Sequence, residues 1–268
     1  FIILDLPPTE PNPNSIWIQT YSHRHYGIGF DQALIIKSRK TQSGHHVDYH
    51  VINANGQAVG QCDNGARCVA DYLYQSGQWS ANTPLHLHAL DNQLTVTRSD
   101  TGQYCVFMGK ILPGINTSEH QATTQTLAYQ KKALTCRHLF IGNPHVIIHT
   151  SPNDTIDLDA MGQYCQTHYP EGINVTQLIS EPNNRLRIKT YERGAGQTLS
   201  CASAACCAAV AAYDWGLSEA QTDIQTPGGI LTITYDPTTG YVTQAGPATY
   251  VYTGNYHTSD TLSNKAPY

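Results

Sequence analysis

The chain has 268 residues, only 13% of them charged, and a formal net charge of −5. Its length suits two domains of about 110 to 150 residues. The acidic balance and the lack of a basic run argue against a nucleic-acid partner. No apolar stretch approaches the ~18 residues of a membrane span, and no signal peptide is visible, so we expect a cytoplasmic protein without membrane association.

The predicted elements are mostly strands, marked by alternating or continuous apolar residues. In chain order we expect strands at Phe1–Leu4, Ala33–Ile36, Asp48–Asn53, Gln93–Thr97, Tyr104–Met108, His138–Ile141, His145–His149, Asn174–Leu178, Arg185–Tyr191, Ile230–Tyr235 and Thr249–Tyr252. Helices are expected at Ser15–Arg24, Asn64–Ser76, Ile156–Thr167 and Ser203–Trp215. The polar stretch Leu112–Gln125, which contains Pro and Gly, is the expected break between domains.

One segment of the chain is repeated. Cys62–Gly77 aligns without a gap on Cys201–Gly216, and cysteine, alanine, tyrosine and glycine recur at matching offsets. In each copy the cysteine lies two residues before an expected helix N-cap, Asn64 or Ser203, and the helix stops at a glycine. A repeat of this kind indicates two similar half-domains.

We therefore predict an α+β fold of two pseudo-symmetric domains, each a mostly antiparallel, barrel-like sheet around a central helix. The expected domains are residues 1–112 and 113–252, with a C-terminal tail, 253–268, that returns to the first domain. Both repeat helices are rich in alanine on all faces, as a helix enclosed by a sheet should be. The active site is expected in the cleft between the two domains.

The eight cysteines are too few for a disulfide-dense scaffold and include no Cys-x-x-Cys pair, so we expect reduced thiols. Histidine pairs such as His45/His46 and His86/His88 lack partner ligands at zinc spacing, and we expect no metal. Three further cysteines fall inside the expected helices, where a cysteine usually packs as a small hydrophobe. They are Cys68, Cys206 and Cys207.

Two thiols at helix N-termini suit the inversion of a carbon centre. Inversion removes a proton from one face of the carbon and returns one to the other, so two groups must flank it. A helix N-terminus lowers the pKa of a cysteine, which makes thiolate accessible at neutral pH. Backbone N–H groups there can also hold a substrate carboxylate. We predict Cys62 and Cys201 as the two bases. The predicted carboxylate cradle comprises Asp63, Asn64, Ala202 and Ser203.

Motifs along nearly the whole chain resemble those of diaminopimelate epimerase. They are FIILD, YGIGFDQ, VINANGQAVGQCDNGARC, IGNPH, EGINV and YERGAG, followed by the PGG and AGPA turns. The resemblance implies the two-domain fold, a small-molecule substrate, and no pyridoxal phosphate, metal or other cofactor. It also implies interconversion of LL- and meso-2,6-diaminopimelate on the route to lysine and peptidoglycan. The oligomeric state stays open, with a homodimer as one option.

The resemblance also implies roles for single residues. His145 and Glu192 match a histidine and a glutamate that lie by the thiols and support their protonation states. An Arg fork and several amides suit a fixed carboxylate and ammonium, because these groups supply both donors and acceptors. The residues that match the family's substrate-binding positions are Gln32, Asn53, Asn143, Asn174 and Arg193.

The chain departs from the family pattern in the repeat. Asp63 stands where the first motif has Gly, Ala202 and Ala204 stand where the second has Gly, and Ala58 replaces a preceding Glu. A Cβ at such a turn can block a ligand, and the Asp63 carboxylate would repel a substrate carboxylate. The family's His-Gly-x-Gly-Asn segment would precede Phe1, where we expect further sequence because the chain lacks an initiating Met. Two alternatives stay open: a related racemase for histidine or hydroxyproline, and a catalytically impaired homologue.

Overall fold

A computed structural model describes residues 1–39, 45–60, 62–90, 92–114, 124–130, 132–154, 156–182 and 185–255. The chain forms two compact units: unit 1 is Phe1–Val106 with the C-terminal segment from Pro247, and unit 2 is Phe107–Gly246. The division falls a few residues before the boundary we expected at 112. Most of the expected break, Leu112–Gln125, and most of the expected tail, 253–268, lie outside the described residues.

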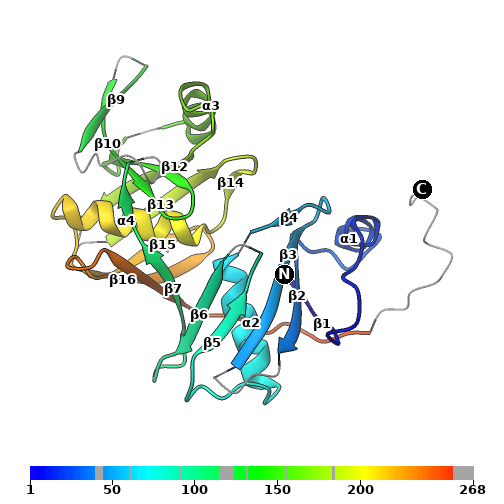
Figure 1. Ribbon diagram of the computed structural model, residues 1–268. Helices are drawn as coiled ribbons and strands as arrows, with labels where there is room; N and C mark the ends of the chain where they lie inside the picture. The colour runs from blue at the N-terminus through cyan, green and yellow to red at the C-terminus, as the bar shows by residue number, and fades with distance from the viewer. Residues whose placement is uncertain are drawn as a thin grey trace. The chain divides into compact units, whose positions relative to one another are not determined.

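Unit 1 combines helices with a mixed sheet (Figure 1). Strand β1 runs parallel to β2, and β2 is antiparallel to β3. In turn, β3 is antiparallel to β4 and parallel to β5, and β5 is antiparallel to β6. The elements are β1 (Ile2–Asp5), α1 (Ser15–Ser22), β2 (Gln32–Arg39), β3 (His45–Asn53), β4 (Ala58–Val59), α2 (Asp63–Gln75), β5 (Leu85–His88), β6 (Gln93–Arg98) and β7 (Tyr104–Lys110), the last of which continues into unit 2.

Unit 2 repeats this order of elements, preceded by additional strands. From β11 onward, each helix and strand follows in the same sequence as in unit 1, and the corresponding pairs have the same direction: β11–β12 and β13–β15 are parallel, whereas β12–β13, β13–β14 and β15–β16 are antiparallel. The elements are β8 (Leu112–Pro113), β9 (Gln125–Tyr129), β10 (Lys132–Phe140), β11 (Pro144–Thr150), α3 (Leu158–His168), β12 (Asn174–Glu181), β13 (Arg185–Glu192), β14 (Gly196–Thr198), α4 (Ala202–Asp214), β15 (Gln221–Thr226), β16 (Gly229–Tyr235) and β17 (Tyr241–Gly246). The two halves that the sequence repeat indicated are therefore present.

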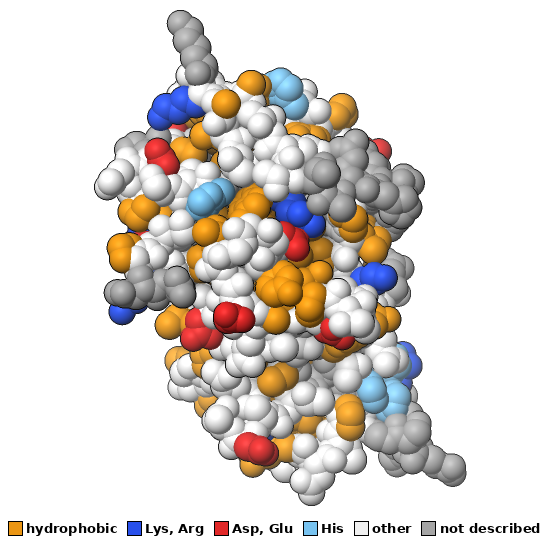
Figure 2. Space-filling model, turned by 90° about the vertical axis from the view of Figure 1, so that its left-hand side faces the viewer, with side chains coloured by type: hydrophobic (Ala, Val, Ile, Leu, Met, Phe, Trp, Pro, Cys, Tyr) orange, Lys and Arg blue, Asp and Glu red, His pale blue; other side chains and the backbone are white. Residues whose placement is uncertain are grey.

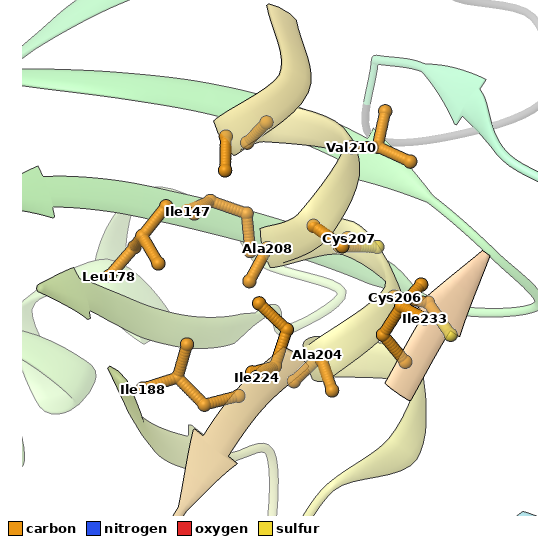
Figure 3. Packing of buried hydrophobic residues seen from close by; sticks show 14 of the residues in the cluster. Ile147, Leu178, Ile188, Ala204, Cys206, Cys207, Ala208, Val210, Ile224 and Ile233 are labelled. Atoms are coloured by element: carbon orange, nitrogen blue, oxygen red, sulfur yellow. The ribbon is translucent and has the colours of Figure 1, made fainter. Parts of the chain in front are cut away.

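Helix α4 is enclosed by the strands of unit 2. Every residue from Ala204 to Ala212 is buried, and the helix packs against isoleucine and leucine side chains that project from the surrounding strands (Figure 3). Alanine and cysteine side chains are small enough to let strands approach the helix on all sides. The labelled strand residues are Ile147, Leu178, Ile188, Ile224 and Ile233. The prediction of a sheet-enclosed helix is confirmed for α4.

Helix α2 is less completely covered than its counterpart. Its first turns are buried, but Tyr74 and Gln75 at its C-terminal end are exposed. Two charged side chains, Arg67 and Asp71, are buried with it. The expectation of an alanine-lined helix on all faces is wrong for α2, because its sequence places polar and aromatic side chains on one side.

Both repeat helices end as the sequence indicated. Gly77 and Gly216 follow the last helical turn with φ of 72° and 70°, a left-handed conformation that glycine adopts without strain. The N–H groups of Gln78 and Leu217 donate to carbonyls of the preceding turn, at 2.9 and 2.8 Å. These paired bonds form a Schellman cap at each helix.

The strand expected at Thr249–Tyr252 is absent. These residues have no regular secondary structure, and the large side chains of Tyr250, Val251 and Tyr252 are exposed. Their β-forming composition therefore finds no neighbouring strand to pair with. Conversely, the strands β4 and β14 were not predicted, because two or three residues are too few to display a periodicity. Strand β5 was also missed, although its sequence LHLH alternates.

The surface is sparsely charged. On the face of the molecule in Figure 2, a few acidic and basic side chains lie among many hydrophobic and uncharged ones. Within the described ranges, no helix is long and apolar enough to cross a membrane.

Candidate active site

Cys62 is itself the N-cap of α2. Its backbone is extended, with φ −143° and ψ 107°, and its Sγ accepts a hydrogen bond from the Gly65 N–H at 3.3 Å. Its carbonyl oxygen accepts the first helical bond, from Ala66, at 2.9 Å. The prediction that Asn64 caps this helix is wrong: Asn64 lies inside the first turn, because the last extended residue is the cysteine, whose sulfur takes the capping position.

Cys201 occupies the same position in unit 2 with a different set of contacts. It is the N-cap of α4, but its side chain makes no capping hydrogen bond. Its Sγ lies 3.4 Å from the Ser203 hydroxyl oxygen instead. Ser203 is therefore a neighbour of the thiol and not the cap that we predicted. Both thiols thus precede the first residue of a helix, Asp63 in one unit and Ala202 in the other.

The surroundings of the two cysteines favour the thiol form. Burial raises the pKa of Cys62 to about 12; the Gly65 N–H lowers it, whereas neighbouring Asp63 raises it further. Burial also raises the pKa of Cys201, and the Glu192 carboxylate adds to that rise. The expected lowering of both pKa values by the helix N-termini is therefore wrong, because desolvation of the sulfur exceeds the stabilisation from the first-turn N–H groups.

Asp63 is a buried carboxylic acid beside Cys62. It is 9% exposed, and burial raises its pKa to about 6, against the lowering effect of Arg67. Its carboxyl is therefore on the borderline of ionisation near neutral pH. A charge at this position acts on Cys62 directly, since the two residues adjoin at the start of the helix.

Two of the predicted substrate-binding amides meet at one end of the unit 1 sheet. Gln32 and Asn53 are register partners on β2 and β3, and Gln32 Nε2 donates to Asn53 Oδ1 at 2.9 Å. Both side chains are half-buried. The pair leaves further donor and acceptor capacity for a ligand, because each amide carries two N–H groups and an oxygen.

Unit 2 brings together a second set of predicted residues. His145, which is fully buried, lies opposite Asn174 in the parallel pairing of β11 with β12. Its Nε2 lies 2.9 Å from Asn143 Oδ1 and 3.5 Å from Asn174 Nδ2. Asn174 Oδ1 in turn accepts from the backbone N–H of Arg193 at 2.9 Å. Asn143, His145, Asn174 and Arg193 therefore form one polar cluster.

His145 is held neutral in this cluster. Burial lowers its pKa to about 3. An amide oxygen can only accept, so Nε2 carries the proton and donates to Asn143. The 3.5 Å contact between Nε2 and Asn174 Nδ2 then joins two donors and is not a hydrogen bond. Nδ1 is then a bare acceptor, and it has no hydrogen-bond partner among the described residues.

Glu192 accepts a short hydrogen bond from the Thr198 hydroxyl and lies close enough to Cys201 to raise its pKa. Asn53 and Glu192 each stand nine residues before the cysteine of their unit, at the end of β3 and of β13. The two units therefore place an amide and a carboxylate at equivalent positions. This difference makes the surroundings of the two thiols unequal.

Other residues of the site region carried no sequence signal. Thr198 orients Glu192, and Tyr49 donates from its hydroxyl to the Cys62 carbonyl oxygen at 2.8 Å. Tyr49 stands in an alternating strand whose pattern indicates only burial. Arg67, which acts on Asp63, lies in the CDNGARC motif and could have been singled out there.

The histidine pairs of unit 1 lie on neighbouring strands. The parallel pairing of β3 with β5 sets His46 opposite His86, and His46 Nδ1 lies 2.8 Å from His88 Nε2. The rings of His46 and His88 stack. In the part of the chain that the structure describes, no group of three or more His, Cys, Asp or Glu side chains could hold a metal ion.

Known proteins share this fold over most of the chain. A predicted epimerase from Pseudomonas aeruginosa aligns with a TM-score of 0.62 at 13% identity, covering 91% of this chain and 88% of that one. A hydroxyproline epimerase from Agrobacterium vitis aligns with a TM-score of 0.59 at 10% identity, covering 89% and 81%. At such low identities these structures establish the fold alone, and they confirm the predicted class.

Sequence comparison goes further than the fold. The sequence model for diaminopimelate epimerase matches residues 138–251. The diaminopimelate epimerase of Coxiella burnetii is 34% identical over 268 residues, covering 96% of this chain and 94% of its own length. That of Xylella fastidiosa strain M23 is 31% identical over 271 residues, covering 96% and 92%. The chain therefore belongs to the diaminopimelate epimerase family and is an isomerase.

Proposed function

We propose that this protein epimerises LL-2,6-diaminopimelate to meso-2,6-diaminopimelate with two cysteine bases, one from each unit. One observation carries the proposal: each unit places a cysteine at the N-cap of the corresponding helix. These are Cys62 before α2 and Cys201 before α4. One base cannot readily serve both faces of a carbon, and a duplicated thiol supplies two.

The reaction moves one proton at each thiol. The thiolate of one cysteine takes the α-proton and becomes a thiol, leaving a carbanion next to the substrate carboxylate. The thiol of the other cysteine then donates its proton to the opposite face and becomes a thiolate. The inverted product leaves the two protonation states exchanged, so the reverse reaction uses the same groups in opposite roles.

The substrate itself helps to generate the thiolate. Burial raises the pKa of both thiols. The α-ammonium of a bound amino acid lies one bond from the reacting carbon, and an adjacent positive charge favours the ionised sulfur. In unit 1 the Gly65 N–H adds a donor to Cys62 Sγ. Binding of the substrate ammonium is therefore expected to lower the pKa of the neighbouring thiol.

The remaining predicted residues hold the parts of the substrate that do not react. The first-turn backbone N–H groups at Asp63, Asn64, Ala202 and Ser203 are proposed to cradle the α-carboxylate. Gln32, Asn53, Asn143, Asn174 and Arg193 are proposed to bind the distal amino-acid group. We assign His145 and Glu192 to the control of thiol protonation, and Glu192 already raises the pKa of Cys201. Family membership supports a cytoplasmic role in making lysine and peptidoglycan precursors.

The test is α-proton exchange in deuterated water, followed by mass spectrometry, with LL-diaminopimelate, histidine and hydroxyproline in parallel. We expect exchange and epimerisation with diaminopimelate only. Exchange confined to histidine or hydroxyproline would assign the protein to another amino acid. No exchange with any of the three would identify a catalytically impaired homologue.

Variants test the two bases in the same assay. Cys62→Ala and Cys201→Ala should each abolish epimerisation, because return of a proton to the second face needs both groups. Cys206→Ala and Cys207→Ala are matched controls: both side chains are fully buried in α4, and their loss should affect stability by about 1 kcal/mol at most. Near-normal epimerisation by Cys62→Ala or Cys201→Ala would refute the two-base assignment.

A further inference from the structure

Tyr49 is a buried hydroxyl that the proposed chemistry does not use. It lies in the middle of β3 with 1% of its surface exposed, among the largest fully buried side chains of the chain. A buried phenol normally needs a partner for its O–H group. The partner here is the carbonyl oxygen of Cys62, at 2.8 Å.

That carbonyl belongs to the N-cap residue of α2. It also accepts the first helical hydrogen bond from Ala66 at 2.9 Å, so it receives two donors from different directions. The Tyr49 bond fixes the peptide that follows Cys62 relative to β3, whereas the helical bond only fixes it relative to its own helix. Because two donors hold the Cys62 carbonyl oxygen, the sulfur of the same residue stays within reach of the Gly65 N–H, at 3.3 Å.

Gly65 leaves the space that this hydroxyl fills. A Cβ added to Gly65 would lie 2.6 Å from Tyr49 Oη and 2.8 Å from Leu34 Cδ2. The phenol oxygen therefore packs directly against the first turn of α2. Because Gly65 has no side chain, the Tyr49 hydroxyl can occupy the space beside this turn.

Unit 2 has no corresponding hydroxyl. Ile188 stands 13 residues before Cys201, as Tyr49 does before Cys62, and it is buried in the core around α4. The side chain of Cys201 makes no capping hydrogen bond, although the Ala204 N–H, the counterpart of the Gly65 N–H, lies near enough to its sulfur to lower its pKa. The two cysteines are therefore supported differently: one by a cross-strand hydroxyl, and the other by apolar packing with Ser203 and Glu192 near the sulfur.

We propose that Tyr49 is a positioning residue for Cys62, whose hydroxyl holds the N-cap peptide so that the sulfur keeps its N–H donor and its reactive geometry. The inference rests on the proposed catalytic role of Cys62. Tyr49 acts only through Cys62 and touches no reacting atom. Burial raises the pKa of Tyr49 well above its usual value, so the hydroxyl remains a donor throughout the working pH range.

The test compares Tyr49→Phe with Tyr104→Phe. Tyr104 is 3% exposed, and its hydroxyl donates to Asp71 at 2.8 Å in the same unit. The two variants therefore lose the same group from buried positions, but only the first loses a bond to Cys62. Circular dichroism and thermal melting establish that each variant is folded.

Two readouts separate positioning from general loss of structure. The first is the pH dependence of iodoacetamide alkylation of Cys62 and Cys201, followed peptide by peptide. In Tyr49→Phe the Cys62 profile should move to higher pH and its rate at pH 8 should fall severalfold, while the Cys201 profile stays unchanged. The second is kinetics: kcat should fall about tenfold, the worth of one buried hydrogen bond, with KM within about twofold.

An unchanged Cys62 profile in Tyr49→Phe, or an equal shift in Tyr104→Phe, would overturn the inference. The alkylation readout does not depend on activity. Failure of the proposed function would show separately, as epimerisation that survives Cys62→Ala. Loss of activity in Cys62→Ala together with normal alkylation and kcat in Tyr49→Phe would leave the function standing and remove the role of Tyr49.

Discussion

Asp63 is a buried acidic residue directly beside Cys62, at a position where the resemblance in sequence predicts glycine. Its carboxyl is buried at the start of α2, and burial raises its pKa to about 6. Below pH 6 the group is neutral and tolerates a substrate carboxylate nearby. Above pH 6 it is ionised and repels that carboxylate, and it also raises the pKa of Cys62.

We predict that Asp63→Asn improves substrate binding at alkaline pH. The KM of the unaltered protein should rise as pH passes through 6, whereas the KM of the variant should not. At pH 8 the variant should have a KM lower on the order of tenfold, and at pH 5 the two should agree, because both side chains are then neutral. Steady-state kinetics across this range is the measurement. The control is Asp100→Asn, which removes the same charge from an exposed position. A ratio of KM values between the unaltered protein and Asp63→Asn that does not change with pH would contradict the prediction.

His145 makes folding stability depend on pH. Its pKa is about 3 in the folded chain and about 6.5 when unfolded. Between these values the unfolded state binds the proton and the folded state does not. The contribution of neutral His145 to the free energy of unfolding is thus fully present above pH 6.5, and it is lost as pH falls from 6.5 toward 3.

We predict that His145→Asn reduces this loss of stability. Between pH 7 and pH 5 the unaltered protein should lose on the order of 2 kcal/mol more unfolding free energy than the variant, since each pKa unit corresponds to about 1.4 kcal/mol. Urea unfolding at the two pH values measures the difference. Equal losses in both proteins would show that folding does not lower the pKa of His145.

At the level of elements, α3 packs against β13 through a glycine. A Cβ on Gly162 would lie 2.3 Å from Cγ of the Tyr191 ring. The ring cannot move aside easily, because Tyr191 is paired in register with Val175 and Gln197 on both flanking strands. Tyr191 also directly precedes Glu192 and Arg193, so the helix contact supports the site residues at the end of β13.

We predict that Gly162→Ala destabilises the protein by about 1 to 3 kcal/mol, the usual effect of overpacking. Gly60→Ala is the matched control, because a Cβ there meets no atom within 4 Å, and its effect should stay within about 0.5 kcal/mol. Chemical denaturation of both variants provides the comparison. Equal stability of the two variants would mean that α3 can move away from the Tyr191 ring without loss of unfolding free energy.

For the whole molecule, the proposed mechanism makes the two units unequal partners in one reaction. Each single cysteine variant keeps one thiol. We predict that Cys62→Ala and Cys201→Ala each still exchange the α-proton of one epimer, the one whose proton faces the surviving thiol, and that the two variants select opposite epimers. Deuterium uptake by LL- and meso-diaminopimelate in separate reactions measures this selection. Exchange of the same epimer by both variants would contradict a division of the two faces between the units.

The sequence by itself determined the architecture and the residues to examine. Its gapless repeat predicted two halves, and the positions of α1 to α4 agree with the predicted helices to within about two residues. The glycines after α2 and α4 predicted both helix ends correctly, because a left-handed residue is a local requirement. The motifs around Cys62, His145 and Arg193 pointed to the family, since side chains that bind ligands recur at fixed spacings.

The tertiary structure decided what depends on burial and on contacts between distant segments. It made Cys62 and Cys201 the N-caps and raised their pKa values, because desolvation depends on the strands packed around each helix. It paired β3 with β5 across 40 residues, and so stacked histidines that seemed unrelated in sequence. It also placed Tyr49 on the carbonyl of Cys62 and Thr198 on Glu192. Local periodicity reports which side of a strand is buried, but only the folded chain determines which atoms meet there.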